Sequence, residues 1–244
     1  MQIWSVLRMI LLCILFFLAV VQIYVHWFAS QRRRGGKKRF VGTAVLWLIV
    51  FLIPSWSLPP DSPDTTAQKE AEYPAWLVYY NQTDPRWAEE RYGQTDLIKE
   101  TGCGPTVLAM AVSSLTETEI NPKEMADWAS EHGYCSPGSG SYHTLIADGL
   151  VQFGLTCTPS DDAQTVRQAL QDGFPVIVLM GEGHFTGGGH FLLLCDIDEA
   201  QTVFVADPKS TVNTEKRWAF DLIAGEAKTS PTTGGAYWII EKQV

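Results

Sequence analysis

The first 60 residues of this chain contain no Asp or Glu, although the full sequence of 244 residues contains 27. The same stretch carries seven of the 18 Lys and Arg residues, so its formal charge is +7 and that of the remainder is −16. Such a split indicates two environments within one chain. The acidic remainder argues against nucleic acid or an anionic lipid surface as its partner, because both require a basic footprint.

Cysteine is scarce and never forms a CxxC pair, which gives little support for a thiolate zinc site. The chain has five cysteines, which are Cys13, Cys103, Cys135, Cys157 and Cys195. The last four would be able to form two disulfides in an extracellular setting. The alternative is that Cys157 and Cys195, which lie in strand-like patterns, are small buried apolar residues.

Two apolar runs occupy residues 1–58. The first extends from about Ile3 to Ala29 with Arg8 as its only charge, and the second from Phe40 to about Leu58. A helix of about 20 apolar residues crosses a bilayer, so both runs are predicted to be transmembrane helices. The loop 30–39 carries six Lys and Arg residues, which places it on the cytoplasmic side. A cleaved signal peptide is the alternative for the first run, but that run is longer than such peptides.

Residues 59–72 are rich in Pro, Asp, Thr and Glu, a composition that is typical of a linker. Because the basic loop is held inside the cell, both ends of the helical hairpin are expected outside. The domain that follows, residues 73–244, is therefore predicted to face the exterior of the cell membrane.

Helical patterns precede strand patterns in residues 73–244. Helices are predicted at Pro105 to Leu115, from an Asn121 cap to Gly133, at Tyr142 to Phe153, and at Asp161 to Gln171 behind a Ser160 cap. Strands are predicted at Pro175 to Met180, His190 to Asp196, Thr202 to Ala206 and Ala236 to Glu241, the middle two as a hairpin. This order indicates an α+β domain with N-terminal helices packed on an antiparallel sheet.

Cys103 is the candidate nucleophile. It stands between Gly102 and Gly104, directly before a predicted helix. The glycines would let a substrate backbone approach, and the helix N-terminus offers unpaired N–H groups that favour a thiolate and stabilise an oxyanion. The alternative is a buried cysteine that only packs, as free cysteines usually do.

His190 is the candidate general base, because a thiol at its usual pKa needs one. It begins a predicted strand after three glycines, and these leave space beside it. His184 competes for this role from a Gly-rich loop, where its orientation is poorly fixed. His132 and His143 lie on helical patterns and are expected on the surface.

Asp207 and Gln82 complete the set of candidates. Asp207 ends the strand after His190, and the predicted hairpin register places the two opposite each other, so that the carboxylate would orient the imidazole. The alternative is that Asp207-Pro208 only ends a strand. The Gln82 amide would be able to donate to an oxyanion beside the Cys103 N–H. The alternative is that Gln82 is an ordinary polar loop residue.

Together these stretches resemble the double-glycine-leader, or bacteriocin-processing, cysteine peptidases in their stand-alone C39-like branch. The resemblance covers roughly Tyr79 to Ile240 and rests on the order Gln82, Gly102-Cys103-Gly104-Pro105, Gly189-His190-Phe191 and Asp207-Pro208. It implies a papain-like fold, with Cys103, His190 and Asp207 as catalytic residues and Gln82 in the oxyanion hole. It implies no metal and no cofactor.

Three features differ from the classical members of that family. Those proteins join the domain to a transporter with a nucleotide-binding unit, whereas this chain has no Gly-x-x-x-x-Gly-Lys motif. The glutamine of the classical members is closer to the cysteine than the 21 positions that separate Gln82 from Cys103 here. Their peptidase domains also face the cytoplasm, whereas residues 73–244 of this chain are predicted to face the exterior.

The sequence therefore predicts a membrane-anchored cysteine peptidase or hydrolase that cleaves a peptide or amide bond. A cell-wall amidase or acyl transferase, acting on a peptidoglycan-type substrate with the same site, is one alternative. A non-catalytic tethered binding or immunity module is another. The expected partners are the substrate and the membrane, and no nucleic acid is expected.

Overall fold

A computed structural model of the chain describes residues 21, 22, 25, 72–230 and 235–242. The chain divides into two compact units, Met1–Asp64 and Thr65–Val244. The predicted transmembrane hairpin of residues 1–58, its basic loop and the linker 59–72 lie almost entirely outside the described residues. Within the part of the chain that is described, no helix has both the length and the apolar character that crossing a bilayer requires.

A central antiparallel sheet organises the second unit. In the described residues its strands follow the order β5-β10-β6-β7-β8-β9. Their bounds are β5 Leu155–Ser160, β6 Val176–Met180, β7 His190–Ile197, β8 Thr202–Ala206, β9 Arg217–Ala219 and β10 Tyr237–Lys242. Two short strand pairs lie outside it, β1 Arg91–Tyr92 with β2 Asp96–Leu97, and β3 Cys135–Ser136 with β4 Gly140–Ser141.

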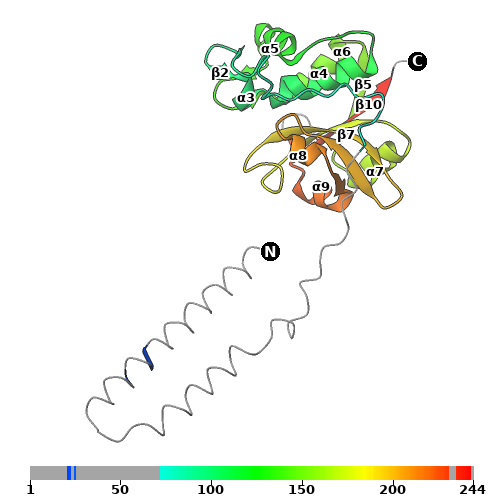
Figure 1. Ribbon diagram of the computed structural model, residues 1–244. Coiled ribbons are helices and arrows are strands. Elements are labelled where there is room, and N and C mark those ends of the chain that lie inside the picture. Colours follow the sequence, from blue (N-terminus) through cyan, green and yellow to red (C-terminus); the bar gives the residue numbers. More distant parts are fainter. Residues whose placement is uncertain (1–20, 23–24, 26–71, 231–234, 243–244) are drawn as a thin grey trace, which may run out of the picture. The chain divides into compact units, whose positions relative to one another are not determined.

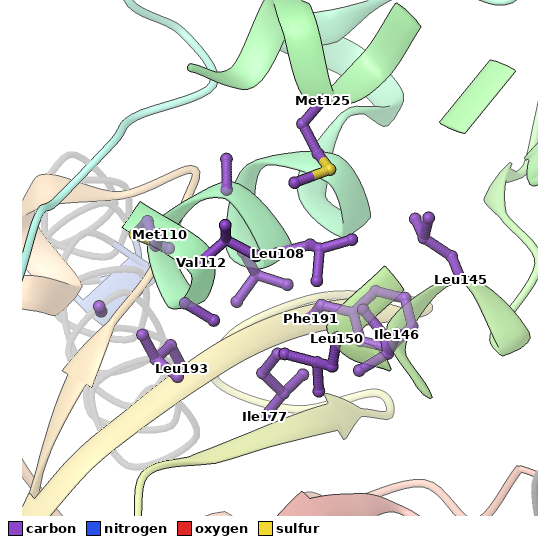
Figure 2. Packing of buried hydrophobic residues seen from close by; sticks show 14 of the residues in the cluster. Leu108, Met110, Val112, Met125, Leu145, Ile146, Leu150, Ile177, Phe191 and Leu193 are labelled. Atoms are coloured by element: carbon purple, nitrogen blue, oxygen red, sulfur yellow. The ribbon is translucent and has the colours of Figure 1, made fainter. Parts of the chain in front are cut away.

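The helices from the first half of this unit cover one face of the sheet (Figure 1). They are α3 Ile98–Thr101, α4 Cys103–Leu115, α5 Pro122–Glu131 and α6 Thr144–Gln152. The central helix α4 is buried without interruption from Gly104 to Val112, as expected for a helix that is apolar on all sides. Figure 2 shows Leu108 and Val112 of α4 and Leu193 of β7 among the side chains of this core.

The later helices cover the opposite face (Figure 1). Helices α7 Ala163–Gln171 and α9 Phe220–Glu226 pack there, and α8 Thr211–Thr214 follows β8. Side chains along β7 alternate between the two faces of the sheet. Leu193 lies in the core with α4, and Leu192 lies in the core with α7 and α9. The antiparallel sheet with helices packed on it confirms the α+β class. The short elements α3, α8, α9, β1 to β4 and β9 were not predicted, and β5 was indicated only by the strand-like pattern around Cys157.

Caps decide where two of the predicted helices begin. The Asn121 cap is confirmed: its side chain accepts from the N–H groups of Lys123 and Glu124, and the Glu124 carboxylate accepts from the Asn121 N–H. The predicted Ser160 cap is wrong. Asp162 caps α7 instead, because its carboxylate reaches the first free N–H groups of that helix, whereas Ser160 is the last residue of β5.

The predicted β7–β8 hairpin is present, but its register differs from the prediction by two residues. Leu193 pairs with Ala206 and Leu194 with Val205, and a bulge follows. Extending that register places Asp207 opposite Leu192 and not opposite His190. Because side chains alternate with a period of two, the shift leaves His190 and Asp207 on one face as diagonal neighbours.

Replacing Asn121 with Ala should lower the free energy of unfolding by about 1 kcal/mol, because the first turn of α5 loses its side-chain acceptor. Urea denaturation monitored by circular dichroism measures the change. Asn121→Ser is the matched control, since a serine hydroxyl can still accept the bond. Equal losses in the two variants would show that the cap contributes nothing specific.

Candidate active site

Cys103 is the first residue of α4, and Gly102 is the N-cap of that helix. A Cβ added to Gly102 would lie 2.5 Å from the Ile98 carbonyl oxygen, and one added to Gly104 would lie 2.5 Å from the Ser141 hydroxyl. The sequence suggested that these glycines admit a substrate. The structure shows that close packing of the protein's own atoms already requires both.

The Cys103 thiol is held among hydrogen-bond donors. Burial acts to raise the pKa of Cys103, but the hydrogen bond and charge of His190, with the backbone N–H groups of Phe191 and Gly104, outweigh it and lower the pKa. The N–H of Phe191 comes from β7 and that of Gly104 from α4, so both layers of the domain contact the sulfur. The arrangement stabilises a thiolate.

His190 begins β7 and is 5% exposed. Its Nε2 lies 2.8 Å from Asp207 Oδ1, which leaves Nδ1 as the ring nitrogen that can exchange a proton with Cys103. Burial acts to lower the pKa of His190, but its hydrogen bonds to Asp207 and Cys103 and their charges raise it to about 9. The imidazolium form is therefore favoured at neutral pH.

Asp207 directly follows β8 and is 1% exposed. Besides His190, its Oδ1 accepts from the N–H groups of Lys209 and Ser210, and its Oδ2 accepts from Asn213 Nδ2 at 2.8 Å. Burial acts to raise the pKa of Asp207, but His190, Asn213 and the Lys209 N–H lower it. The carboxylate stays ionised and keeps one orientation toward the imidazole.

Sequence reasoning did not find the residues that fix Asp207 in place. Asn213 lies in α8, which was not predicted, and Thr214 Oγ1 accepts from the Asp207 N–H at 3.0 Å. The Tyr79 hydroxyl donates to the Asp207 carbonyl at 2.8 Å. The polar run after Asp207-Pro208 was the available signal for Asn213 and Thr214. No sequence pattern indicated that Tyr79 contacts Asp207.

Gln82 is 1% exposed and contacts both the turn after β8 and helix α3. Its backbone N–H donates to the Pro208 carbonyl at 2.6 Å, beside Asp207. Its side-chain Nε2 donates to the carbonyl oxygens of Ile98 at 3.2 Å and Lys99 at 2.8 Å, in the short helix before Cys103. Both amide hydrogens therefore have acceptors within the protein.

The other described histidines have different partners. His184, the competing candidate base, is exposed and pairs through Nδ1 with the Glu226 carboxylate of α9. His132 contacts the Trp128 carbonyl on the surface. His143 is half-buried, contrary to expectation: its Nδ1 lies 2.8 Å from the Ser230 hydroxyl and its ring packs on Phe191. Burial and the charge of Lys228 lower its pKa.

The four cysteines of the described residues are all free thiols. Cys195 is buried in β7 and Cys157 is partly buried in β5, and burial raises the pKa of both. Burial also raises the pKa of Cys135. Cys103 is thus the described cysteine whose surroundings favour the thiolate. Among the described residues, no group of three or more His, Cys, Asp or Glu side chains is arranged to hold a metal ion.

Comparison with protein families decides the assignment. The model of the Peptidase C39-like family matches residues 77–237, which is most of the described domain. The chain belongs to the Peptidase C39-like family. The match contains every candidate residue of the site, and it agrees with the resemblance drawn from roughly Tyr79 to Ile240. Residues 73–244 therefore include a C39-like cysteine peptidase domain.

Two of the solved structures that are similar to this C39-like chain are peptidases. One is the peptidase domain of Streptococcus ComA, a bifunctional ABC transporter of a quorum-sensing pathway, at 17% identity and a TM-score of 0.45, covering 63% of this chain and 100% of that one. The other is a double-glycine-motif protease from an AMS/PCAT transporter in complex with the leader peptide, at 14% identity and a TM-score of 0.43, covering 72% and 96%. No curated protein matches the chain.

Asp207→Asn should raise the pH at which Cys103 becomes reactive toward iodoacetamide by about one to three units, because the imidazolium loses its carboxylate partner. In the unmodified chain, the raised pKa of His190 keeps its ring protonated below about pH 9. Above that pH the imidazolium is lost. The measurement is the rate of alkylation of Cys103 as a function of pH.

Asp196→Asn is the matched control for this pH profile, since it makes the same change at the other end of the β7–β8 hairpin. Asp196 pairs with Arg217, so its loss should leave the Cys103 profile unchanged. A profile that does not move in Asp207→Asn would show that the carboxylate does not sustain the thiolate.

Proposed function

We propose that this chain hydrolyses a peptide bond with Cys103 as nucleophile, His190 as the proton carrier and Asp207 as the residue that orients His190. The observation that carries the proposal is the position of His190, hydrogen-bonded to Asp207 through Nε2 and interacting with the Cys103 thiol. A buried cysteine that only packs would not need a charged partner, and burial alone would raise its pKa.

The proposed reaction begins with the thiolate–imidazolium pair. The Cys103 sulfur attacks the carbonyl carbon of the scissile bond, and the carbonyl oxygen becomes an oxyanion. When the C–N bond breaks, the imidazolium gives its proton to the departing amine, which leaves a thioester on Cys103. Water then attacks the thioester, His190 accepts the water proton, and the carboxylic acid product leaves as the thiolate re-forms.

The oxyanion of this reaction needs donors at the start of α4. The N–H of Cys103 is the first of that helix, where no earlier residue of α4 can accept its bond. The positive end of the helix dipole favours negative charge at the same place. One such donor typically contributes about 10²–10³ in rate. We assign the Cys103 N–H this role.

A peptide is the substrate class that the family assignment favours, because the model of the Peptidase C39-like family matches residues 77–237. The fold does not indicate which peptide sequence is cleaved. A pool of internally quenched peptides, including members with two glycines before the scissile bond, is therefore the appropriate first probe.

Cys103→Ala should lower hydrolysis of the active members of that pool by about 10³-fold or more, because no other group can form the thioester. The full-length chain in detergent micelles is the enzyme, and fluorescence reports cleavage. Circular dichroism should show that the variant remains folded. Cys135→Ala, at another free cysteine, is the control and should keep full activity. Full activity in Cys103→Ala would end the proposal.

We further propose that residues 1–58 anchor the enzyme as a transmembrane hairpin with the peptidase domain outside the cell. Support comes from two apolar runs on either side of a loop with six positive charges. This topology would give the enzyme peptide substrates outside the cytoplasm.

Protease added to intact bacterial spheroplasts should digest residues 73–244 and leave a small fragment that contains the hairpin. The fragment should stay with the membrane after washing with alkaline carbonate. Digestion of detergent-opened spheroplasts is the control for protease activity. Protection of the domain in intact spheroplasts, with digestion only after detergent, would place the domain inside and overturn the topology.

A further inference from the structure

The three glycines that precede His190 have open space beside them. A Cβ added to Gly187 or Gly188 would meet nothing within 4 Å among the described residues. One added to Gly189 would meet only Leu179 Cδ1 of β6, at 4.0 Å. The described side chains therefore leave the approach to His190 from the β6 side unfilled.

Lys228 lies in the extended segment that follows α9 and runs beside β6. Its N–H donates to the Leu179 carbonyl at 2.8 Å, next to the isolated bridge between Ala227 and Met180. Leu179 pairs in turn with Phe191 of β7. Residues opposite each other on neighbouring strands share a face, so Lys228 lies in one row with Leu179 and Phe191, on the face that α4 covers.

The side chain of Lys228 runs past the end of β6 that adjoins His190. A Cβ added to Gly181 would lie 3.4 Å from Lys228 Cβ and 4.0 Å from its Cδ. Gly181 directly follows Met180, which pairs with His190. Two strand spacings of about 4.8 Å separate Lys228 from β7, a distance that its flexible four-carbon stem can largely cover. The ammonium group can therefore reach the space in front of His190.

A hydrogen bond ties the same segment to the helices around the nucleophile. Ser230 lies two residues after Lys228, and its hydroxyl is 2.8 Å from His143 Nδ1. The His143 ring also packs on Phe191, with the ring centroids 5.7 Å apart. The turn that carries His143 packs on Gly104, the residue after the nucleophile. His143 thus holds the Lys228 segment beside the first turn of α4.

Lys228 brings an unpaired positive charge to this region. It is exposed, and no carboxylate pairs with it among the described residues. Of the acids beside it, Glu226 pairs with His184, and Glu182 is exposed and forms no ion pair within the described part of the chain. Burial and the charge of Lys228 lower the pKa of His143, so that its ring is uncharged at neutral pH.

We infer that Lys228 is a specificity-determining residue that favours substrates with a carboxylate close to the scissile bond, on the β6 side of Cys103. The bond between His143 and Ser230 keeps the segment that carries Lys228 at the site. The inference rests on the proposed function, since it names a substrate class for the same site. The carboxylate can belong to an acidic side chain or to the end of a peptide chain, because a lysine ammonium acts as a point charge.

Three alkylating probes test this preference without requiring hydrolysis. Iodoacetyl-glutamine amide has no carboxylate, iodoacetyl-glutamate amide has one on its side chain, and iodoacetyl-glutamine has one at its chain end. The full-length chain in detergent micelles is treated with each probe at neutral pH and low salt, and mass spectrometry gives the rate at Cys103. At least one acidic probe should react about three- to fivefold faster than the neutral probe, near the upper end of what an exposed ion pair contributes. The faster acidic probe identifies the source of the carboxylate.

Variants separate the charge of Lys228 from other causes. Lys228→Met should make the three rates nearly equal, and Lys228→Glu should make the acidic probes slower than the neutral one. His143→Phe keeps a ring but loses the bond to Ser230, so it should lower the preference as well. Lys123→Met removes the same charge from α5, where Lys123 pairs with Asp127, and is the matched control that should retain the preference. In about 1 M salt the preference of the unmodified chain should decline, because the charges are screened.

Quenched peptides with Glu or Gln at each position next to the scissile bond give the second measurement. The ratio of kcat/KM for Glu over Gln should fall about three- to fivefold in Lys228→Met. An unmodified chain without a preference for either acidic probe, or a preference that Lys228→Met retains, would overturn the inference. If no peptide is cleaved, the proposed function fails separately, and the probes still decide whether Lys228 attracts a carboxylate to Cys103.

Discussion

The buried hydrogen bond between His190 and Asp207 is the interaction on which the site depends. His190 begins β7 and Asp207 directly follows the neighbouring strand β8, and the two residues are 5% and 1% exposed. Taking a charged pair out of water is costly unless further hydrogen bonds surround it. The N–H groups of Lys209 and Ser210 and the Asn213 amide supply these bonds. The loop and the short helix after β8 thus maintain a charge that the strands alone could not bury.

The packing of α4 on β7 brings that pair to the nucleophile. Leu108 and Val112 of α4 and Leu193 of β7 share one core, which sets the distance between the start of the helix and the start of the strand. The sulfur of Cys103 then interacts with the N–H of Phe191, next to His190 in β7. A cysteine of raised pKa would be the usual result of such burial, and the opposite shift at Cys103 follows from charge brought in by the sheet.

Particular elements show how far local patterns determine this domain. The Asn121 cap could be read directly, because the residues that form it are close in sequence. The β7–β8 register could not, because it depends on where the turn lies: Ile197 pairs with Val203, and the bulge between Leu194 and Asp196 then shifts the pairing by only one residue. Pairing of His190 with Asp207 was nevertheless anticipated, since a shift of two residues preserves the face. The contacts of Asn213 and Tyr79 with Asp207 were not predicted, because only the fold brings their segments next to Asp207.

By itself the sequence determined the charge division of the chain, the α+β class, the family and the four candidate residues Gln82, Cys103, His190 and Asp207, because each depends on residue type and local order. Only the tertiary structure decided what surrounds those residues. The lowered pKa of Cys103, the donors on Asp207 and the two acceptors of the Gln82 amide arise between segments far apart in sequence. Electrostatic and hydrogen-bond energies depend on distance in space, and that distance is set by how the helices pack on the sheet.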